Sequence, residues 1–264
     1  MAEALNIQYV ANAVDNKRIG CRFYYYPEID STNNQALLLG QQGASDGTVI
    51  IADYQLVGRG RANRQWVSSA KTNLLFSVIL KPSNNNPHEM TMLAAVAVHE
   101  VLSQILTASE VVIKWPNDIL VDNQKICGIL AETQTKGEQS SFIVVGIGLN
   151  INMSSEDIPE NINRKITSLS ICMGRGQVSR EEVLVKVLYS LDKWYDKILT
   201  GSSTGLASQY IQNSNLHGRL VSLQCGNEII KGFVTHLDEQ GKLWIRDEYG
   251  RTNGFVGGEI LKIF

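Results

Sequence analysis

The stretch KWPNDILVDNQKICGILAE, residues 114–132, places two short apolar runs on either side of a turn. Apolar runs of this length are typical of β-strands, and the pair Asp122–Asn123 between them is typical of a hairpin turn. Side chains alternate between the two faces of a strand, so Lys125 and Gly128 should lie on opposite faces. A lysine on a hairpin is usually solvated, but the apolar residues around it favour a pocket. The stretch therefore predicts a β-hairpin that carries a lysine close behind its turn.

Polar residues crowd the start of this hairpin. Pro116 has no N–H to donate to a neighbouring strand, and Lys114, Asn117 and Asp118 surround it. The carboxylate of Asp118 is a hard oxygen ligand of the kind that Mg²⁺ prefers, and the Asn117 amide can bind the edge of a base. A ligand site and an edge-strand turn capped by Asn and Asp explain these residues equally well.

Outward from the hairpin, the pattern is that of an α+β domain followed by a small all-β unit. The near-continuous apolar run TVIIADY, residues 48–54, is typical of a strand that is covered on both faces. Apolar residues at helical spacing predict one helix over residues 88–106 and another that begins after Ser179. Short strands separated by turns follow, which favours a small barrel. We therefore expect two domains, residues 1–215 and residues 216–264.

The composition is typical of a soluble globular protein. The 264 residues are 44% hydrophobic and 19% charged, with a net charge of −2. This balance gives no general electrostatic footprint for nucleic acid, and no apolar run is long enough for a membrane span, so we expect neither partner. The four cysteines form no CxxC pair, no secretory signal precedes them, and the histidines are isolated. These features favour a reducing cytoplasm and argue against a zinc site.

A short basic stretch, GRGRANRQW at residues 58–66, stands out from this composition. Glycine lets backbone amides approach a ligand closely, and arginine presents paired donors to carboxylates and phosphates. A phosphate site and a solvated basic turn both explain the stretch. The Gly-x-Gly of VVGIGLNIN, residues 144–152, lacks the third glycine of a dinucleotide fingerprint, and the sequence has no P-loop motif. A nucleotide would therefore have to bind in another way.

The polar stretch DSTN, residues 30–33, stands at the start of a predicted helix. Helix capping explains these side chains, although hydroxyls there can also donate to a carbonyl or urea-like oxygen. In order and spacing, DSTN, Gln55, GRGRANRQW, KWPND, KICGIL and GIGLNIN resemble the motifs of biotin protein ligases, the biotin–[acetyl-CoA-carboxylase] ligases. The resemblance extends from about Phe23 to the C-terminal GFVGGEI.

This resemblance implies a fold and an activity. Family members combine a class II aminoacyl-tRNA synthetase-like domain, a mixed or antiparallel sheet with helices, with a small C-terminal SH3-like β-barrel. They use MgATP to activate biotin to biotinyl-5′-AMP, release pyrophosphate, and pass the biotinyl group to one lysine of a biotin carboxyl carrier protein. The expected substrates are biotin and ATP with Mg²⁺, and no tightly bound prosthetic group is expected. The expected partner is the carrier domain of a biotin-dependent carboxylase, and the chain would act as a monomer or a homodimer.

The resemblance also assigns residues. Biotin would be held by Ser31, Thr32, Asn33, Gln55, Arg59, Gly60, Arg61, Lys125 and Gly128. The ATP or adenylate would be held by Arg59, Arg61, Arg64, Trp66, Lys114, Asn117 and Asn150. The catalytic residues would be Lys125, Arg59, Arg61 and Asp118, with Asp118 also as the Mg²⁺ ligand. Positioned cations would bring the biotin carboxylate and the α-phosphate together, and the lysine would hold the activated carbonyl oxygen.

The sequence departs from the family pattern in two places. Ala62 and Asn63 stand where many relatives carry basic or glycine residues, so the loop should be less cationic. Residues 153–188 contain no Trp, Phe or Tyr, although some relatives stack an aromatic ring on adenine there. The apolar residues left to cover the adenine are Ile162, Ile166 and Leu169.

Two alternative functions compete with this assignment. A lipoate or octanoyl ligase has the same fold, but its Arg-rich and Gly-Gly-Gly signatures are missing from the sequence. A non-catalytic biotin sensor would not need Lys125, Arg59 and Arg61 together. The stretch before Asp30 is too short for the N-terminal winged helix-turn-helix of bifunctional relatives, so we expect the ligase-only form. Because glycine makes the arginine loop costly to order, we also expect this loop to be mobile without ligand.

Overall fold

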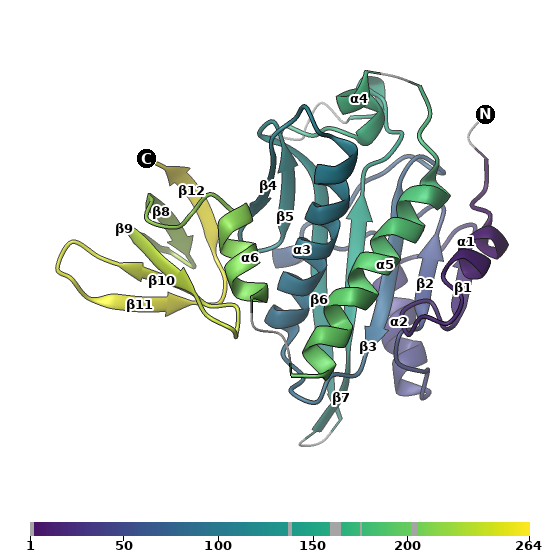
Figure 1. The fold of residues 1–264 in the computed structure, drawn as a ribbon, viewed down its shortest axis with the longest axis horizontal. Helices are drawn as coiled ribbons and strands as arrows, with labels where there is room; N and C mark the ends of the chain where they lie inside the picture. The colour runs from purple at the N-terminus through teal and green to yellow at the C-terminus, as the bar shows by residue number, and fades with distance from the viewer. Residues whose placement is uncertain (1–2, 137–138, 159–164, 175, 202–204) are drawn as a thin grey trace.

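The structure, a computed structural model, describes residues 3–136, 139–158, 165–174, 176–201 and 205–264 (Figure 1). The chain forms two β-sheets, and helices cover the larger one. Within the described residues, no helix is both long and apolar enough to cross a membrane. All four cysteines are free, so they contribute no disulfide to the fold.

The larger sheet has seven strands in the order β1-β2-β3-β7-β6-β5-β4. These strands are β1 (Phe23–Tyr26), β2 (Val49–Ala52), β3 (Leu74–Leu80), β4 (Val111–Lys114), β5 (Asp118–Val121), β6 (Gln124–Lys136) and β7 (Gln139–Leu149). Strands β1 and β2 are parallel, and the other neighbouring pairs are antiparallel. Asp122 and Asn123 join β5 to β6 with φ angles of 47° and 63°, the left-handed conformation of a tight hairpin turn. The mixed sheet and its hairpin are confirmed.

Helices lie on both faces of this sheet. They are α1 (Ile7–Ala13), α2 (Thr32–Gln41), α3 (Pro87–Ile105), α4 (Leu169–Met173), α5 (Arg180–Leu199) and α6 (Leu206–Asn213). Figure 1 shows α3 and α5 side by side across one face, where the main hydrophobic core lies. Val49 and Ile51 of β2 point into that core, whereas Ile50 packs in a smaller cluster with α2 on the opposite face. Strand β2 is therefore buried on both faces, as its apolar run predicts.

The helix ends follow the predicted capping signals with one informative exception. The Ser179 hydroxyl accepts a hydrogen bond from the Glu182 backbone N–H at the start of α5. The apolar face of this helix is buried and includes Val183, Val187, Leu191 and Trp194. Ser31 occupies the N-cap position of α2, but its side chain makes no capping bond. The Ser31 hydroxyl therefore keeps its hydrogen-bonding capacity for another partner.

The C-terminal segment forms a separate antiparallel sheet of five strands in the order β11-β10-β9-β8-β12. Its strands are β8 (Leu220–Cys225), β9 (Glu228–Leu237), β10 (Leu243–Arg246), β11 (Thr252–Phe255) and β12 (Glu259–Ile263). Helix α6 contacts α3 and β4 of the larger unit and β9 of the smaller sheet. Figure 1 shows this sheet beside the β4 edge of the larger unit. We propose the domain boundary between residues 215 and 216, in the segment that joins α6 to β8.

Candidate active site

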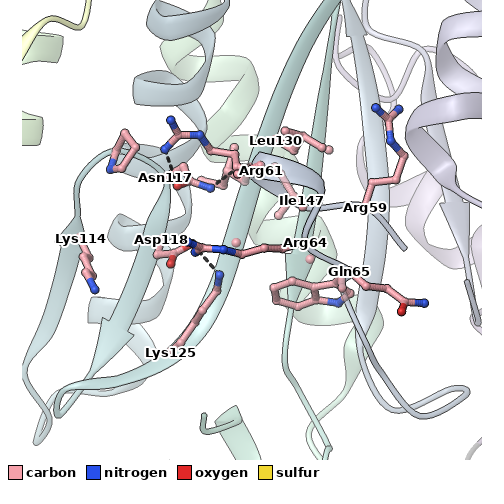
Figure 2. A pocket seen from close by; sticks show the side chains of 18 of the residues that line it. Arg59, Arg61, Arg64, Gln65, Lys114, Asn117, Asp118, Lys125, Leu130 and Ile147 are labelled. Carbon is pink, nitrogen blue, oxygen red and sulfur yellow. Dashed lines mark hydrogen bonds and ion pairs between the residues drawn. The ribbon is translucent and has the colours of Figure 1, made fainter. Parts of the chain in front are cut away.

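A cavity of about 810 Å³ lies on the face of the large sheet opposite α3, beyond the N-terminal end of α2 (Figure 2). All of the residues that the sequence analysis assigned to biotin binding, to ATP binding or to catalysis through the family motifs line this cavity. They are Ser31, Thr32, Asn33, Gln55, Arg59, Gly60, Arg61, Arg64, Trp66, Lys114, Asn117, Asp118, Lys125, Gly128 and Asn150. The structure thus brings together residues from the two ends of a segment of 120 positions, and their individual roles stay predictions.

One end of the cavity presents short polar side chains. The Gln55 Oε1 atom accepts hydrogen bonds from the Thr32 backbone N–H at 2.7 Å and from the Thr32 hydroxyl at 2.9 Å. Its amide orientation is fixed by these bonds, which leaves Gln55 Nε2 as a donor with no partner in the described part of the chain. Together with the Ser31 hydroxyl, this donor gives the cavity wall the hydrogen-bonding groups that a urea-like ligand requires.

The Asn33 side chain lies in the wall of the cavity, where its amide is already hydrogen-bonded to other protein groups. Its Oδ1 atom accepts a hydrogen bond from the Ser77 hydroxyl at 2.7 Å, and its Nδ2 atom donates to Glu132 at 2.8 Å. The side chain rests on Gly146, where an added methyl group would lie only 2.0 Å from Asn33 Oδ1. Ser77 and Glu132 are two functional neighbours that the sequence analysis missed. The sequence does hold a signal for Ser77, because a serine stands inside the apolar run LLFSVIL, residues 74–80.

Lys125 and Asp118 form an ion pair at the other end of the cavity. Lys125 Nζ lies 2.6 Å from Asp118 Oδ1, and the two side chains are 20% and 11% exposed. Figure 2 shows the lysine reaching from its strand toward the aspartate. Lys125 and Asp118 both belong to the predicted hairpin, and the pairing of its strands brings their side chains together.

The prediction that Lys125 and Gly128 lie on opposite faces of the strand is wrong. Ile119 pairs with Cys127 but Leu120 pairs with Lys125, so Ile126 is the extra residue of a β-bulge. The bulge resets the alternation and turns Lys125 to the cavity side. A methyl group built on Gly128 would lie 3.1 Å from Lys125 Nζ and 2.8 Å from the Trp66 ring.

The Trp66 indole covers the glycine-lined floor of the cavity. A methyl group on Gly148 would approach this ring to 2.5 Å, so both glycines are needed for the ring to lie there. Lys125 Nζ lies 5.4 Å from the centre of the indole, within the range of a cation–π contact. The Trp66 Nε1 atom is buried and has no hydrogen-bond partner among the described residues. A buried donor without a partner in a cavity wall is available to a ligand.

The arginine loop forms a small hairpin over the cavity. Gly60 N–H donates to the Arg64 carbonyl at 2.7 Å, and Trp66 N–H donates to the Gly58 carbonyl at 2.9 Å. A side chain at position 58 would meet the Trp66 carbonyl at 2.4 Å, so this fold of the loop requires glycine there. The structure gives this closed arrangement, and the predicted mobility of the loop without ligand stays a prediction.

Arg61 lies deepest of the arginines in this loop. Its Nη1 atom donates to Asn117 Oδ1 at 3.2 Å, and its Nη2 atom would lie 3.0 Å from a methyl group on Gly257 of the C-terminal segment. Burial lowers the pKa of the Arg61 guanidinium, and the nearby Asp118 carboxylate opposes that shift. The cation is thus held between the hairpin and the smaller sheet.

Arg59 points away from Arg61 and Arg64 (Figure 2), and each of the three arginines has a different partner. Arg64 Nη2 lies 2.7 Å from Glu259 Oε2 of β12. Arg59 Nη2 lies 2.6 Å from Glu132 Oε1 of β6. In this arrangement a protein carboxylate holds the Arg59 guanidinium, and the roles of Arg59 and Arg61 toward biotin and ATP stay predictions.

The expected adenine side of the cavity is only partly as predicted. Ile166 lines the cavity together with Met153, which the sequence analysis missed. Leu169 was wrongly predicted to cover the adenine, because it begins α4 and is fully buried in the main core. Ile162 lies outside the described residues. Four further lining residues come from the smaller sheet and its turns, namely Gln224, Gly226, Gly258 and Glu259.

Among the described residues, no group of three or more His, Cys, Asp or Glu side chains gathers in a way that could hold a metal ion. Asp118 is the predicted Mg²⁺ ligand, and its carboxylate opens on the cavity beside Lys125. One protein carboxylate completed by substrate phosphates is a common donor set for Mg²⁺. The residues present therefore fit a metal that arrives with a nucleotide.

Comparison with known proteins gives a consistent set of relatives. Residues 25–150 match the model of the biotin/lipoate A/B protein ligase family. The chain is 31% identical over 235 residues to the bifunctional ligase/repressor BirA of Bacillus spizizenii, covering 88% of this chain and 71% of that protein. It is 29% identical to the biotin–[acetyl-CoA-carboxylase] ligase of Mycobacterium tuberculosis, covering 88% of this chain and 86% of that protein.

A solved structure agrees with these sequence relatives. The biotin protein ligase from Aquifex aeolicus in complex with biotin and ATP superimposes with a TM-score of 0.77 at 30% identity. The match covers 91% of this chain and 97% of that one, so it includes both sheets. Sequence identity, coverage and fold agree, and the chain belongs to the biotin protein ligases, a family of ligase enzymes.

Proposed function

We propose that this chain is an ATP-dependent biotin ligase that works through biotinyl-5′-AMP. In the first step, the biotin carboxylate oxygen attacks the α-phosphorus of ATP, and the bond to pyrophosphate breaks. In the second step, a deprotonated lysine amine of a carrier protein attacks the biotinyl carbonyl, and AMP leaves. The observation that supports this proposal is one cavity with urea-compatible groups at one end and an ion pair with further cations at the other.

The two ends of the cavity divide the work. Ser31 and Gln55 would bind the ureido group of biotin, since each has hydrogen-bonding capacity left. The Lys125 ammonium would keep part of its contact with Asp118 and donate a hydrogen bond to the biotin carboxylate. In the second step it would donate to the carbonyl oxygen of the intermediate. This would stabilise the negative charge that develops in both steps.

Arg61 and Arg64 would serve the phosphates. Two anions repel each other, so their approach needs fixed positive charge close to the α-phosphate. Arg61 is held in place by Asn117, which limits the reorganisation needed when ATP binds. With ATP bound, Asp118 would hold Mg²⁺ together with phosphate oxygens, and the ion would supply charge neutralisation on the phosphates.

The partner and the setting of the reaction are also proposals. We infer that the acceptor is the carrier domain of a biotin-dependent carboxylase, in the cytoplasm, with the ligase as a monomer or a homodimer. No nucleic acid partner is proposed, because the net charge of −2 gives no general footprint for one.

Biotin-dependent exchange of labelled pyrophosphate into ATP tests the proposal. Exchange with biotin but not with lipoate or octanoate is the expected result. Exchange that needs lipoate or octanoate would favour the other branch of the family. Tight biotin binding in calorimetry without any exchange would favour the non-catalytic sensor. The Lys125→Ala variant is the control for contaminating ligase activity.

A further inference from the structure

The side chain of Arg59 is bound at a distance from the other arginines of its loop. Its Nη1 atom donates to Asn34 Oδ1 of α2 at 2.8 Å, and its Nη2 atom lies 2.6 Å from Glu132 Oε1. Figure 2 shows the guanidinium pointing away from Lys125, Asp118 and Arg61. Arg59 thus connects the loop to the α2 end of the cavity and not to its cationic end.

Glu132 uses each of its carboxylate oxygens for a different part of the site. The Oε1 atom receives Arg59, and the Oε2 atom receives Asn33 Nδ2 at 2.8 Å. The Glu132 side chain is 21% exposed and the Arg59 side chain 37%, so the pair is partly shielded from water. Charge-assisted hydrogen bonds of this geometry are stronger than bonds between neutral groups, and the partial exclusion of water keeps the Arg59–Glu132 bond strong.

From Asn33 the hydrogen bonds continue to the residues proposed to bind the ureido group. Asn33 Oδ1 accepts from the buried Ser77 hydroxyl, which also lies 2.8 Å from the Thr32 hydroxyl oxygen. Thr32 in turn holds Gln55 Oε1. One chain of contacts therefore runs from the arginine loop through Glu132 to the wall of the cavity.

We propose that Glu132 is a positioning residue that fastens the arginine loop over the cavity by holding Arg59, while it aligns Asn33 in the wall. Arg59 then acts as the clamp of the loop, and Arg61 and Arg64 remain to meet phosphate. The inference rests on the proposed function, since it names what closes the cavity over biotin. It changes the role of Arg59 from a phosphate donor to a contact within the protein.

The proposal predicts that the two members of the clamp give the same phenotype. A glutamine at position 132 replaces one of the two carboxylate oxygens by an NH2 group, which faces a donor and cannot accept from it, and it removes the negative charge that Arg59 pairs with. Arg59→Met keeps an unbranched apolar stem and removes the charge and the donors. Either Glu132→Gln or Arg59→Met should speed biotin dissociation by about ten- to a hundred-fold, the usual range for losing one charge-assisted bond. The KM for ATP at saturating biotin should stay within about two-fold of wild type. In binding free energy, this change is smaller than the loss of a hydrogen bond to ATP would give.

The experiment measures biotin dissociation by stopped-flow tryptophan fluorescence and the KM for ATP by pyrophosphate exchange, for both single variants and the double variant. A double variant no faster than either single variant is expected, because both lose the same bond. The charge swap Arg59→Glu with Glu132→Arg should recover part of the slow dissociation. Arg22→Met and Glu248→Gln, both at exposed positions, are the matched controls.

Two results would overturn the inference. One is a raised KM for ATP in Arg59→Met with wild-type behaviour in Glu132→Gln, which would return Arg59 to the phosphate. The other is full additivity of the two substitutions with no recovery by the charge swap, which would mean that the residues act separately. A wild-type protein that fails to bind biotin at all would instead contradict the proposed function, before any variant is compared.

Discussion

Lys125 and Asp118 illustrate how one strand irregularity positions a lysine that we propose to be catalytic. The bulge at Ile126 turns the lysine toward the cavity, and Asp118 holds its ammonium at 2.6 Å. The ion pair is largely shielded, so the lysine is positioned before a substrate arrives. Substrate oxygen then has only to share a cation that is already in place.

Replacing Lys125 by alanine should therefore affect both half-reactions. The loss of one charge-assisted bond, about 1.5–3 kcal/mol, predicts a decrease in kcat/KM of at least ten-fold for pyrophosphate exchange and for biotin transfer. Thermal unfolding checks that the fold is retained. Lys186→Ala, on the exposed side of α5, is the control and should keep wild-type rates. Full activity of the Lys125 variant would mean that the lysine is only a solvated hairpin residue.

At this scale, the sequence predicts which residues line the cavity but not where each one points. Ser31, Gln55, Arg61 and Lys125, which the motifs assign to one site, all line the cavity, because these residues sit at strand ends and loops that the fold brings together. The direction of Arg59 depends on Glu132, which is 73 positions away. Pairings of that kind follow from tertiary geometry, which residue type and spacing do not contain.

Among the elements, the arginine loop joins the two sheets at the cavity. Arg61 is wedged between Asn117 and Gly257, and Arg64 pairs with Glu259. Besides the Arg59 contacts with Glu132 and Asn34, the loop is thus held by Asn117 and by the C-terminal segment. Its closed form would shield a reactive anhydride from water and from foreign amines.

The variant Arg61→Gly should release the intermediate. Removal of one bond of about 1.5–3 kcal/mol predicts that biotinyl-5′-AMP leaves ten- to a hundred-fold faster. Freed anhydride would then acylate nearby lysines. Incubation with biotin, MgATP and an unrelated protein, followed by a biotin blot, measures this labelling. Arg22→Gly is the control. A variant that stays active on its carrier but labels the unrelated protein no more than wild type would show that the loop is not a lid.

Helices α3 and α5 are joined by a polar cluster at their exposed edge. Glu100 of α3 accepts hydrogen bonds from Ser190, Lys193 and Trp194 of α5 at 2.8, 2.5 and 3.2 Å. Burial alone would raise the pKa of Glu100, but these bonds outweigh it and hold the pKa below its ordinary value. The ionised form is therefore favoured by folding, and it stabilises the packing of the two helices.

The Glu100→Gln variant should accordingly lose stability in a pH-dependent way. A carboxylate whose pKa is lower in the folded state stabilises the fold above its unfolded pKa, and that contribution disappears as the pH falls through the folded pKa. We expect a lower Tm than wild type at pH 7, and Tm values that converge as the pH falls from the ordinary carboxyl pKa of 4.5 through the lower pKa of the folded state. Glu28→Gln, at an exposed position, is the control. A Tm difference that is the same at every pH would contradict the ionic origin.

The elements themselves were more predictable than their irregularities. Apolar runs, the Asp122–Asn123 turn and the Ser179 cap predicted β2, the hairpin and α5, because each signal acts over a few residues. The bulge was not predictable, since alternation assumes a regular strand and the extra residue is selected by pairing with β5. Leu169 was misplaced for a similar reason, because its burial depends on how α4 packs.

At the scale of the whole molecule, the cavity is shared between the two sheets. Gln224, Gly226, Gly258 and Glu259 line it from the C-terminal side. Arg64 is 54% exposed and Glu259 33%, so their ion pair contributes only about 0–1 kcal/mol to stability. Because the pair lies at the cavity rim, a bound triphosphate would contact both charges. We therefore expect the pair to affect ATP affinity more than folding stability.

The substitutions Glu259→Gln and Arg64→Gln should change ATP binding in opposite directions. Glu259 repels a triphosphate and competes with it for Arg64. It also acts on Arg61, where burial lowers the guanidinium pKa and the Glu259 carboxylate opposes part of that shift. Its neutralisation should lower the KM for ATP by about two- to five-fold at low ionic strength, because rim charges attract or repel a ligand through weakly screened fields. Arg64→Gln removes a cation from the same rim and should raise the KM by a similar factor.

Pyrophosphate exchange at several salt concentrations measures both effects, with biotin kept saturating. The two shifts should shrink together as salt rises, because screening weakens exposed charges. Glu248→Gln makes the same change of charge at an exposed position outside the cavity lining and should leave the KM for ATP unchanged. If Glu259→Gln raised the KM instead, Glu259 would be holding Arg64 in its working position, and the smaller sheet would serve the nucleotide by orienting the loop rather than through its charge.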